Sequence, residues 1–312
     1  MKIVIPGGSG QVGTILARAF QRKGQDVVVL SRRPQTRPWR VVAWNGADLS
    51  DWAHEIDGSD VVINLAGRSV NCRYNAANRR EILQSRVLST RVVGEAIARA
   101  ARPPRVWLQA STATIYAHRF DSANDEHSGT LGGDEIAAPS SWRFSIDVAK
   151  AWERAFEDAV TIRTRKVALR SAMTLSRDPG GVFDTLVRLA RRGLGGKFGD
   201  GRQFMSWIHY QDFVCAVQWL IDNENIAGFV NVASPNPVPN AEFMKVLRTA
   251  CGVPFGLPTA EWMLEIGAVF MRTETELILK SRRVVPARLL ESGFTFRFPR
   301  WPDAAVDLCR GQ

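Results

Sequence analysis

Three glycines near the N-terminus have the spacing of a turn that accepts a phosphate group. Gly7, Gly10 and Gly13 follow the apolar run 2–5, and an amphipathic stretch begins at Gln11. A glycine turn between a strand and a helix lets main-chain amides approach a pyrophosphate at the positive end of the helix. The alternative is a tight structural turn without a ligand. The turn predicts a dinucleotide site, with candidate ligands Gly7, Ser9, Gly10, Gln11, Val12 and Gly13.

The residues after the second apolar run indicate which dinucleotide is expected. An NAD site usually places Asp or Glu about 20 residues beyond the glycine turn, where the carboxylate accepts hydrogen bonds from the ribose. Here the chain reads Leu30, Ser31, Arg32 and Arg33. A guanidinium pairs with a 2′-phosphate and a serine hydroxyl donates to it, so Ser31 and Arg32 predict NADP(H). Two solvated arginines in a loop are the alternative.

Asp48 follows the third apolar run and has two interpretations. Its carboxylate could accept a hydrogen bond from the adenine amine of the cofactor. It could instead cap the N-terminus of a short helix predicted near 51–56. The sequence leaves both roles open.

The elements that must position these residues alternate between strands and helices. Such alternation forms a parallel sheet with right-handed crossovers and helices on both faces. The predicted fold class is α/β, a Rossmann-type doubly wound parallel sheet with ligands at the carboxyl ends of its strands. The periodicity predicts strands at 2–5, 26–30, 40–44, 59–65, 105–110 and 161–169, and helices at 11–23, 77–101 and 144–158.

The pattern changes after residue 170. Glycines and prolines become frequent, and the later segments are mostly helical apart from a short strand at 229–232. We predict an NADP-binding Rossmann domain made of 1–170 plus 207–232. A smaller helix-rich C-terminal subdomain, made of 171–206 plus 233–312, would form a cleft over the nicotinamide.

Further motifs stand at the ends of the predicted strands and beyond them. The fourth strand ends in Asn64-Leu65-Ala66-Gly67, and the fifth is followed by Ala110-Ser111-Thr112-Ala113-Thr114-Ile115-Tyr116. Other segments are Ser85-Arg86, Trp152-Glu153, Gly199 to His209 and Pro286 to Phe294. With the glycine turn, these motifs make the chain similar to extended short-chain dehydrogenase/reductases, and most of all to their atypical epimerase-like branch. The resemblance covers essentially the whole length and implies NADP(H) binding and a small C-terminal domain of unassigned role.

The resemblance also implies a catalytic arrangement that this chain has only in part. In the superfamily a Tyr-x-x-x-Lys pair works with a Ser or Thr. The lysine lowers the tyrosine pKa, the tyrosine exchanges a proton with the substrate oxygen, and the hydroxyl orients that oxygen. Lys150 matches the lysine and Thr112 the hydroxyl, but Ile146 stands where the tyrosine would be. Lys150 is also a candidate to donate hydrogen bonds to the nicotinamide ribose.

Substitutes for the missing acid can be named but not chosen. Tyr116 lies close in sequence to Thr112, Tyr74 lies in the loop after the fourth strand, and Asp147 is one turn from Lys150. Each has a structural alternative, and Tyr116 matches a position that is usually structural in the superfamily. The catalytic candidates are thus Thr112, Lys150 and Tyr116.

The remaining cofactor candidates lie after the fourth strand and on the long helix that follows it. We assign Leu65, Ala66 and Gly67 to the cofactor site through the strand-end motif. Arg86 could clamp a carboxylate or a phosphate, as could Arg73. An internal ion pair or a surface charge is the alternative for both arginines.

Composition excludes disordered, collagen-like and membrane proteins. With 45% hydrophobic and 23% charged residues, the chain is typical of globular proteins. The net charge of +10 comes from basic residues spread along the chain in pairs, so we expect no nucleic-acid partner. The N-terminal apolar run is too short for a signal peptide or a membrane helix, so we expect a cytoplasmic protein without membrane contact. Four cysteines without a C-x-x-C pair, and histidines without ligand spacing, predict no metal site.

Hypotheses from different classes follow. The first is an NADP(H)-dependent oxidoreductase or epimerase-like enzyme acting on a small polar molecule, such as a carbonyl compound or a sugar nucleotide. The second, motivated by the missing tyrosine, is a catalytically silent NADP(H)-responsive regulatory or scaffold protein. A third, nucleic-acid binding, rests on the positive charge alone. A homodimer through the helices 77–101 and 144–158 stays open, as does packing of their apolar faces on the sheet.

Overall fold

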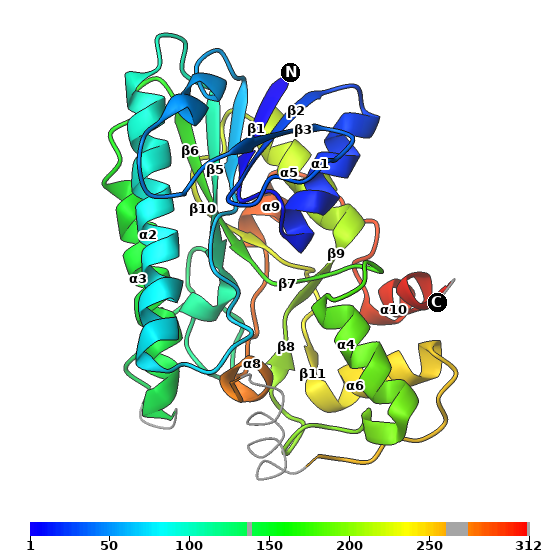
Figure 1. Cartoon of the computed structure of the whole chain (residues 1–312). Coiled ribbons are helices and arrows are strands. Elements are labelled where there is room, and N and C mark those ends of the chain that lie inside the picture. Colours follow the sequence, from blue (N-terminus) through cyan, green and yellow to red (C-terminus); the bar gives the residue numbers. More distant parts are fainter. Residues whose placement is uncertain (136–138, 260–273, 311–312) are drawn as a thin grey trace.

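A parallel sheet forms the centre of the protein (Figure 1). The computed structural model describes residues 1–135, 139–259 and 274–310, and within these ranges seven strands pair in the order β10-β6-β5-β4-β1-β2-β3. All of these pairs are parallel. The predicted doubly wound α/β fold is confirmed. The strands are β1 (Lys2–Pro6), β2 (Asp26–Ser31), β3 (Arg40–Ala43), β4 (Val61–Asn64), β5 (Val106–Thr112), β6 (Arg165–Ser171) and β10 (Gly228–Val232).

Helices cover both faces of the sheet because successive residues of its buried strands point to opposite sides. Ile3 and Ile5 of β1 pack in one apolar cluster with α1 (Gln11–Arg22) and α5 (Tyr210–Asp222). Val4, between them, belongs to a second cluster on the other face. That face is covered by α2 (Ala76–Arg99), α3 (Arg143–Glu157) and the short η1 (Asp51–Glu55), as Figure 1 shows.

The apolar side of α2 packs on the sheet. Val92, Val93, Ala96 and Ile97 are buried in the same cluster as Trp107 of β5. This is one of the two alternatives drawn from the sequence for the long helices. The homodimer stays a prediction.

One predicted strand boundary was wrong. The sequence placed a strand from Thr161, but β6 begins at Arg165. The main-chain N–H of Thr164 donates to the carbonyl of Thr161 at 3.0 Å, which closes a turn before the strand. A run of β-branched residues therefore does not extend the strand across a turn.

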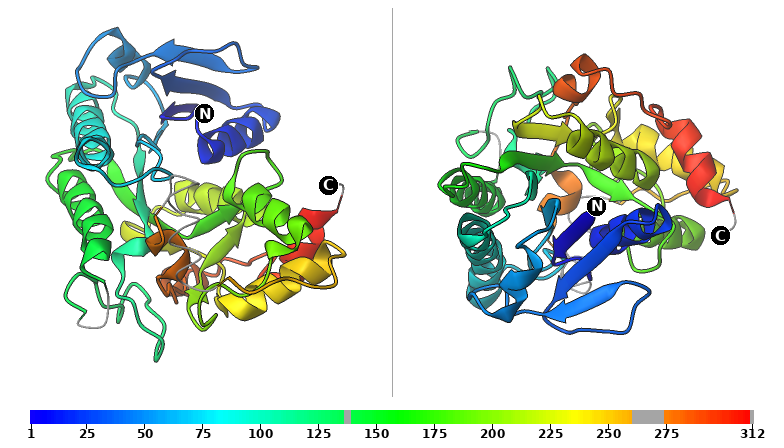
Figure 2. Two further views of the ribbon diagram at one scale, coloured as in Figure 1. Left: turned by 60° about the horizontal axis from the view of Figure 1, so that its bottom comes forward. Right: turned by 90° about the horizontal axis from the view of Figure 1, so that it is seen from above.

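A third apolar cluster forms away from the large sheet, at the lower right of the molecule in Figure 1 and in the left view of Figure 2. In it Phe243 and Trp301 stack with ring centroids 4.0 Å apart. The expected helix-rich character of the C-terminal region is confirmed, but two small two-stranded sheets were not predicted. The helices are α4 (Val182–Leu189), α6 (Asn240–Ala250), α8 (Glu276–Leu279), α9 (Ala287–Glu291) and α10 (Trp301–Cys309), and the small sheets pair β7 (Met173–Leu175) with β9 (Trp207–His209) and β8 (Phe204–Met205) with β11 (Val238–Pro239).

The C-terminal part of the chain also returns to the large sheet. Leu289, Phe294 and Phe296 are buried with α1 and α5 on the first face. Residues 260–273 and 311–312 of the predicted second subdomain lie outside the described residues. In the described ranges, no helix has both the length and the apolar character needed to span a membrane.

His209 links α5, which packs on the large sheet, to α10, which belongs to the third apolar cluster. Its Nδ1 accepts a hydrogen bond from the main-chain N–H of Gln211 and so caps α5. Its Nε2 lies 3.1 Å from Oδ2 of Asp307 on α10, and its ring lies 4.0 Å from that of Phe298. Burial lowers the pKa of His209 to about 4, although the attraction of Asp307 opposes the shift. The folded protein therefore holds this imidazole neutral.

The pKa of His209 predicts a loss of stability in mild acid. Because the unfolded chain binds this proton near pH 6.5 and the folded chain only near pH 4, the free energy of unfolding should fall as the pH drops through that window. The expected loss between pH 7 and pH 4.5 is about 2–3 kcal/mol. His209→Asn keeps an acceptor for the α5 N-terminus and should remove this part of the pH dependence. Denaturant unfolding at both pH values measures the effect.

The exposed His54 provides a matched control for this experiment. His54→Asn should leave the pH dependence of the wild-type protein in place. An equal loss of stability in the His209→Asn protein and in the wild type would contradict the assignment.

Candidate dinucleotide site and catalytic residues

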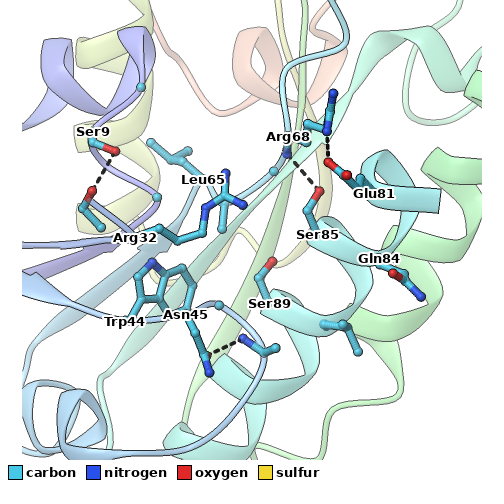
Figure 3. A pocket seen from close by; sticks show the side chains of 18 residues that line it. Ser9, Arg32, Trp44, Asn45, Leu65, Arg68, Glu81, Gln84, Ser85 and Ser89 are labelled. Carbon is cyan, nitrogen blue, oxygen red and sulfur yellow. Dashed lines mark hydrogen bonds and ion pairs between the residues drawn. The ribbon is translucent and has the colours of Figure 1, made fainter. Parts of the chain in front are cut away.

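A cavity of about 430 Å³ opens at the carboxyl ends of β1 and β4. These strands are neighbours, but β1 is followed by β2 on one side and β4 by β5 on the other, so the cavity lies where the strand order reverses. Figure 3 shows this cofactor cavity from close by. It brings together eight of the residues assigned to the cofactor from the sequence, namely Gly7, Ser9, Gly10, Ser31, Arg32, Leu65, Ala66 and Gly67.

Each glycine of the turn is required for a different reason. Gly7 has φ +73°, and a Cβ there would lie 2.5 Å from Cα of Ala66. A Cβ on Gly13 would lie 2.4 Å from Cα of Gly8, so this glycine lets α1 pack against the turn. At Gly10 the nearest atom to a Cβ would be a carbonyl oxygen at 3.8 Å. Gly10 therefore leaves space open in the cavity, while the other two bring main-chain segments together.

The first turn of α1 points its free main-chain N–H groups away from the helix body. Gly10 is the N-cap and has no side chain to accept from these groups, and the turn contains no acidic residue. Gln11, Val12 and Gly13 form this turn but are not among the residues that line the described cavity. The Gln11 amide donates to Oγ of Ser176 at 3.0 Å, and Val12 packs on the core. An anion at the helix N-terminus would be attracted by this arrangement.

Ser31 is the last residue of β2 and Arg32 follows it directly, and the two form one wall of the cavity. The Ser31 hydroxyl lies 3.2 Å from Oγ of Ser9, which ties this wall to the glycine turn. In Figure 3 the Arg32 side chain extends between Leu65 and Trp44. The Arg32 guanidinium is exposed and, within the described residues, forms no ion pair with a carboxylate. This cation is thus available for an anionic group.

The segment after β3 also lines the cavity, and the sequence reasoning missed most of it. The buried indole of Trp44 forms a wall together with residues 45–47, whereas Asp48 does not line the cavity. The Asp48 carboxylate instead accepts from the amide of Asn45 at 2.8 Å. Its interpretation as a helix N-cap was wrong, because Ser50 is the N-cap of η1. The signal that could have found residues 44–47 is their position at the carboxyl end of a strand.

The opposite wall consists of the loop after β4 and one side of α2. The main-chain N–H of Arg68 donates to Oγ of Ser85 at 2.9 Å, and Nη1 of Arg86 donates to the Arg68 carbonyl at 3.0 Å. A Cβ on Gly67 would lie 3.2 Å from the guanidinium carbon of Arg86. The lining residues not predicted here are Arg68, Glu81, Gln84, Ser85, Leu88 and Ser89.

Arg86 acts from behind this loop. Its guanidinium lies 5.0 Å from the ring centroid of Trp152 and also donates to the carbonyl of Ile82. Burial lowers the pKa of Arg86 to about 10. The alternatives of an internal ion pair and a surface charge were both wrong for Arg86 in the described structure, because carbonyl oxygens and an indole surround the cation. From this position the Arg86 side chain supports Gly67 and the loop after β4.

The catalytic candidates lie near the carboxyl end of β5. Thr112 is the last residue of β5, and its Oγ1 accepts from the main-chain N–H of Thr114 at 3.1 Å. Lys150 lies on α3, one turn after Ile146, which is buried. A Cβ on Gly133 would lie 3.5 Å from Nζ of Lys150. The structure therefore places Lys150 against the loop that faces α3.

Tyr116 is held in a buried polar network instead. Its hydroxyl donates to the amide oxygen of Asn231 and accepts from Arg170, both at 3.0 Å. Arg170 forms two hydrogen bonds with Glu153, at 2.8 and 2.7 Å, and Glu153 also accepts from Ser111. Burial raises the pKa of Tyr116. Tyr116 lines none of the described cavities, so the geometry favours its structural interpretation.

The other two substitutes for the missing acid are also engaged elsewhere. The ring of Tyr74 packs edge-on against Phe144, and burial raises its pKa to about 12. Asp147 is exposed and pairs with Arg143 at 3.7 Å. Neither residue lines the cofactor cavity.

The glycine geometry predicts opposite consequences for two similar substitutions. Gly13→Ala places a Cβ against main-chain atoms that cannot move independently, and we expect it to lower the free energy of unfolding by about 1–3 kcal/mol. Gly10→Ala places its Cβ in open space and should change that free energy by less than about 0.5 kcal/mol. Denaturant unfolding of both variants measures the difference. Equal stability of the two would show that the close approach at Gly13 relaxes without cost.

The chain matches known protein families over most of its length. Residues 3–233 match the profile of the NAD dependent epimerase/dehydratase family, and residues 259–308 match a domain of unknown function, DUF1731. The chain is 32% identical over 303 residues to the epimerase family protein SDR39U1 of Bos taurus, covering 96% of each chain. It is 30% identical to the epimerase family protein YfhF of Bacillus subtilis, covering 96% of this chain and 94% of that one.

A solved structure is similar over the entire length. The crystal structure of human epimerase family protein SDR39U1 (isoform2) with NADPH superposes with a TM-score of 0.87 at 28% identity, and the match covers 100% of both chains. The matched family region contains the whole glycine turn, the cofactor cavity and the candidate residues Thr112 and Lys150. The chain belongs to the NAD dependent epimerase/dehydratase family.

Proposed function

We propose that the protein is an NADP(H)-dependent oxidoreductase or epimerase-like enzyme that acts on a small polar substrate, such as a carbonyl compound or a sugar nucleotide. The observation that carries the proposal is Arg32, an exposed cation at the wall of a cavity at the switch point of the sheet. Bound NADPH in the solved human relative supports it. In this proposal residues 1–170 with 207–232 hold the dinucleotide, and 171–206 with 233–312 cover the substrate.

The residues of the cavity fit the parts of this cofactor. The open position at Gly10 and the free N–H groups of α1 suit the pyrophosphate, and Ser31 with Arg32 suits the 2′-phosphate. Leu65 to Gly67 would lie along the opposite side, supported by Arg86.

The chemistry combines a hydride carrier with groups that orient the substrate. When bound, NADP(H) supplies or accepts a hydride. Thr112 would orient the substrate oxygen with its hydroxyl, and Lys150 would donate hydrogen bonds to the nicotinamide ribose. Ile146 has no proton to exchange, which is the observation that favours the second candidate, a catalytically silent protein that responds to NADP(H).

The cofactor assignment is tested by calorimetric titration with NADPH, NADP⁺, NADH and NAD⁺. Arg32→Ala should weaken NADPH and NADP⁺ at least tenfold, because the 2′-phosphate loses a charge-assisted contact, and should leave NADH and NAD⁺ nearly unchanged. Arg33→Ala removes the same charge from the neighbouring residue, which does not line the cofactor cavity, and serves as the control. An equal loss of NADPH and NADP⁺ affinity in both variants would show that general electrostatic attraction, rather than a specific contact of Arg32, causes the effect.

Gly10→Ala tests the space for the pyrophosphate in the same titration. Its Cβ would occupy the space left for the pyrophosphate, so all four dinucleotides should bind at least tenfold more weakly while the fold is retained. Absence of dinucleotide binding to the wild-type protein would overturn the proposed function. Binding without turnover of any carbonyl or sugar-nucleotide substrate would favour the silent regulatory protein.

A further inference from the structure

A second cavity of about 300 Å³ lies beside α3 and has three walls. The loop 133–135 forms one wall, and Trp142, Arg143 and Ile146 form the second at the start of α3. Lys280, which follows α8, forms the third. We call it the α3 cavity. Lys280 lies more than 100 residues from the other two walls in the chain, so only the fold brings it to them.

The α3 cavity lies at the position where the superfamily tyrosine is missing. Ile146 is buried and lines the cavity four residues before Lys150. A Cβ on Gly133 would lie 3.6 Å from Cγ2 of Ile146 and 3.5 Å from Nζ of Lys150. One wall of the cavity therefore touches both the isoleucine and the candidate lysine.

Lys280 is fixed against the end of β5 that carries Thr112. Its Nζ donates to the carbonyl of Thr114 at 2.8 Å, and the N–H of Thr114 donates to Oγ1 of Thr112. An ammonium group has three donors, and within the described residues Nζ makes this hydrogen bond alone. The side chain is 1% exposed, so the remaining donors face the protein interior and the cavity rather than open solvent.

Charged groups surround Lys280 from each neighbouring segment. Burial and nearby Arg282 together lower its pKa to about 8, although Glu276 and Glu135 oppose the shift. His118 lies beside the same segment, with Nδ1 accepting from the N–H of Ser281 at 2.8 Å. Near neutral pH, both the ammonium and the amine of Lys280 are populated.

The other ionisable residues that line the α3 cavity are unsuited to proton exchange. The Glu135 carboxylate accepts from the N–H groups of His118 and Gly133, which helps to hold the pKa of Glu135 below its usual value. The Arg143 guanidinium pairs with Asp147 at 3.7 Å. Asp134 is exposed at the rim. Lys280 is thus the buried group of this cavity that can both give up and regain a proton.

Building on the proposed function, we propose that the α3 cavity receives the reacting oxygen of the substrate and that Lys280 exchanges a proton with it, in place of the missing tyrosine. In the reducing direction the substrate carbon gains the hydride that NADPH would supply, and its C=O bond becomes C–O. The oxygen takes a proton from the Lys280 ammonium, which is left as an amine and regains its proton from water. In the oxidising direction the amine takes the hydroxyl proton, while the carbon gives up the hydride that NADP⁺ would accept.

Glyoxylate, a small carbonyl compound, is the probe for this proposal. A lysine amine condenses with it, and cyanoborohydride traps the adduct for peptide mass spectrometry. At pH 7 we expect Lys280 to be labelled at least tenfold faster than the exposed Lys23 and Lys245, with a midpoint near pH 8. Ile146→Trp, which fills the cavity, should slow this labelling at least fivefold. Labelling of Lys280 no faster than that of the exposed lysines would overturn the proposal.

Catalysis is tested by following NADPH consumption with glyoxylate. Lys280→Arg keeps the positive charge and a donor for Thr114, so NADPH affinity should stay within twofold while turnover falls at least fiftyfold. Adding Ile146→Tyr to this variant restores the usual acid and should recover part of the turnover. Turnover within twofold of wild type in Lys280→Arg would overturn the role of Lys280. Where the wild type does not consume NADPH with this probe, labelling alone decides.

Two readouts separate the inference from the proposed function. Loss of NADPH binding in the wild type, with Lys280 still labelled selectively, would reject the proposed function but leave a carbonyl-accepting cavity. Normal NADPH binding with an unreactive Lys280 would reject the inference and leave the proposed function standing.

Discussion

The contact between the glycine turn and the loop after β4 is the constraint on which the rest of the site depends. Because Gly7 lacks a Cβ and has a positive φ, its main chain lies against that of Ala66 at the switch point of the sheet. The same closeness lets α1 begin directly behind the turn, through Gly13. A cavity between two strand ends can form here because the main chains on both sides are fixed at short range, and side chains such as Arg32 then project into it.

Local patterns in the sequence predict the sheet, its flanking helices and eight of the eighteen residues that line the cavity, because these depend on short-range periodicity and on strand ends. The end of β2 is an example, since Ser31 is the last residue of this buried strand and Arg32 follows it directly. Half of the remaining lining residues come from α2, whose residues 81–89 face the cavity only because that helix packs beside β4 and β5. The periodicity of a helix says which residues share a side but not which neighbour that side meets.

Buried charges were the least predictable part of the site. Arg86 lies on α2 and is surrounded by carbonyl oxygens and an indole, whereas Arg170 lies near the end of β6 and contacts Glu153 and Tyr116. Both stabilise segments rather than stand free for a ligand, as Arg32 does. A sequence shows that a guanidinium is present, whereas its partner is fixed by contacts across tens of residues, here 17 between Arg170 and Glu153 and 18 between Arg86 and Arg68.

Contacts over still longer separations decide what replaces the lost tyrosine. Lys280 contacts Thr114 across 166 residues of sequence. In the same way, Cys251 and Cys309 come within 2.6 Å of one another at the ends of α6 and α10, although their spacing in the sequence indicated no pair. In the superfamily the proton donor and its lysine lie on one helix, so a motif describes them. Here α3 keeps Lys150 while its acid position is apolar. A proton-exchanging group must then come from another segment that reaches the same end of β5, and the segment after α8 reaches it with a buried amine. Proton transfer requires a group of suitable pKa at a place in the fold, and the chain can supply that group from a distant part of its sequence.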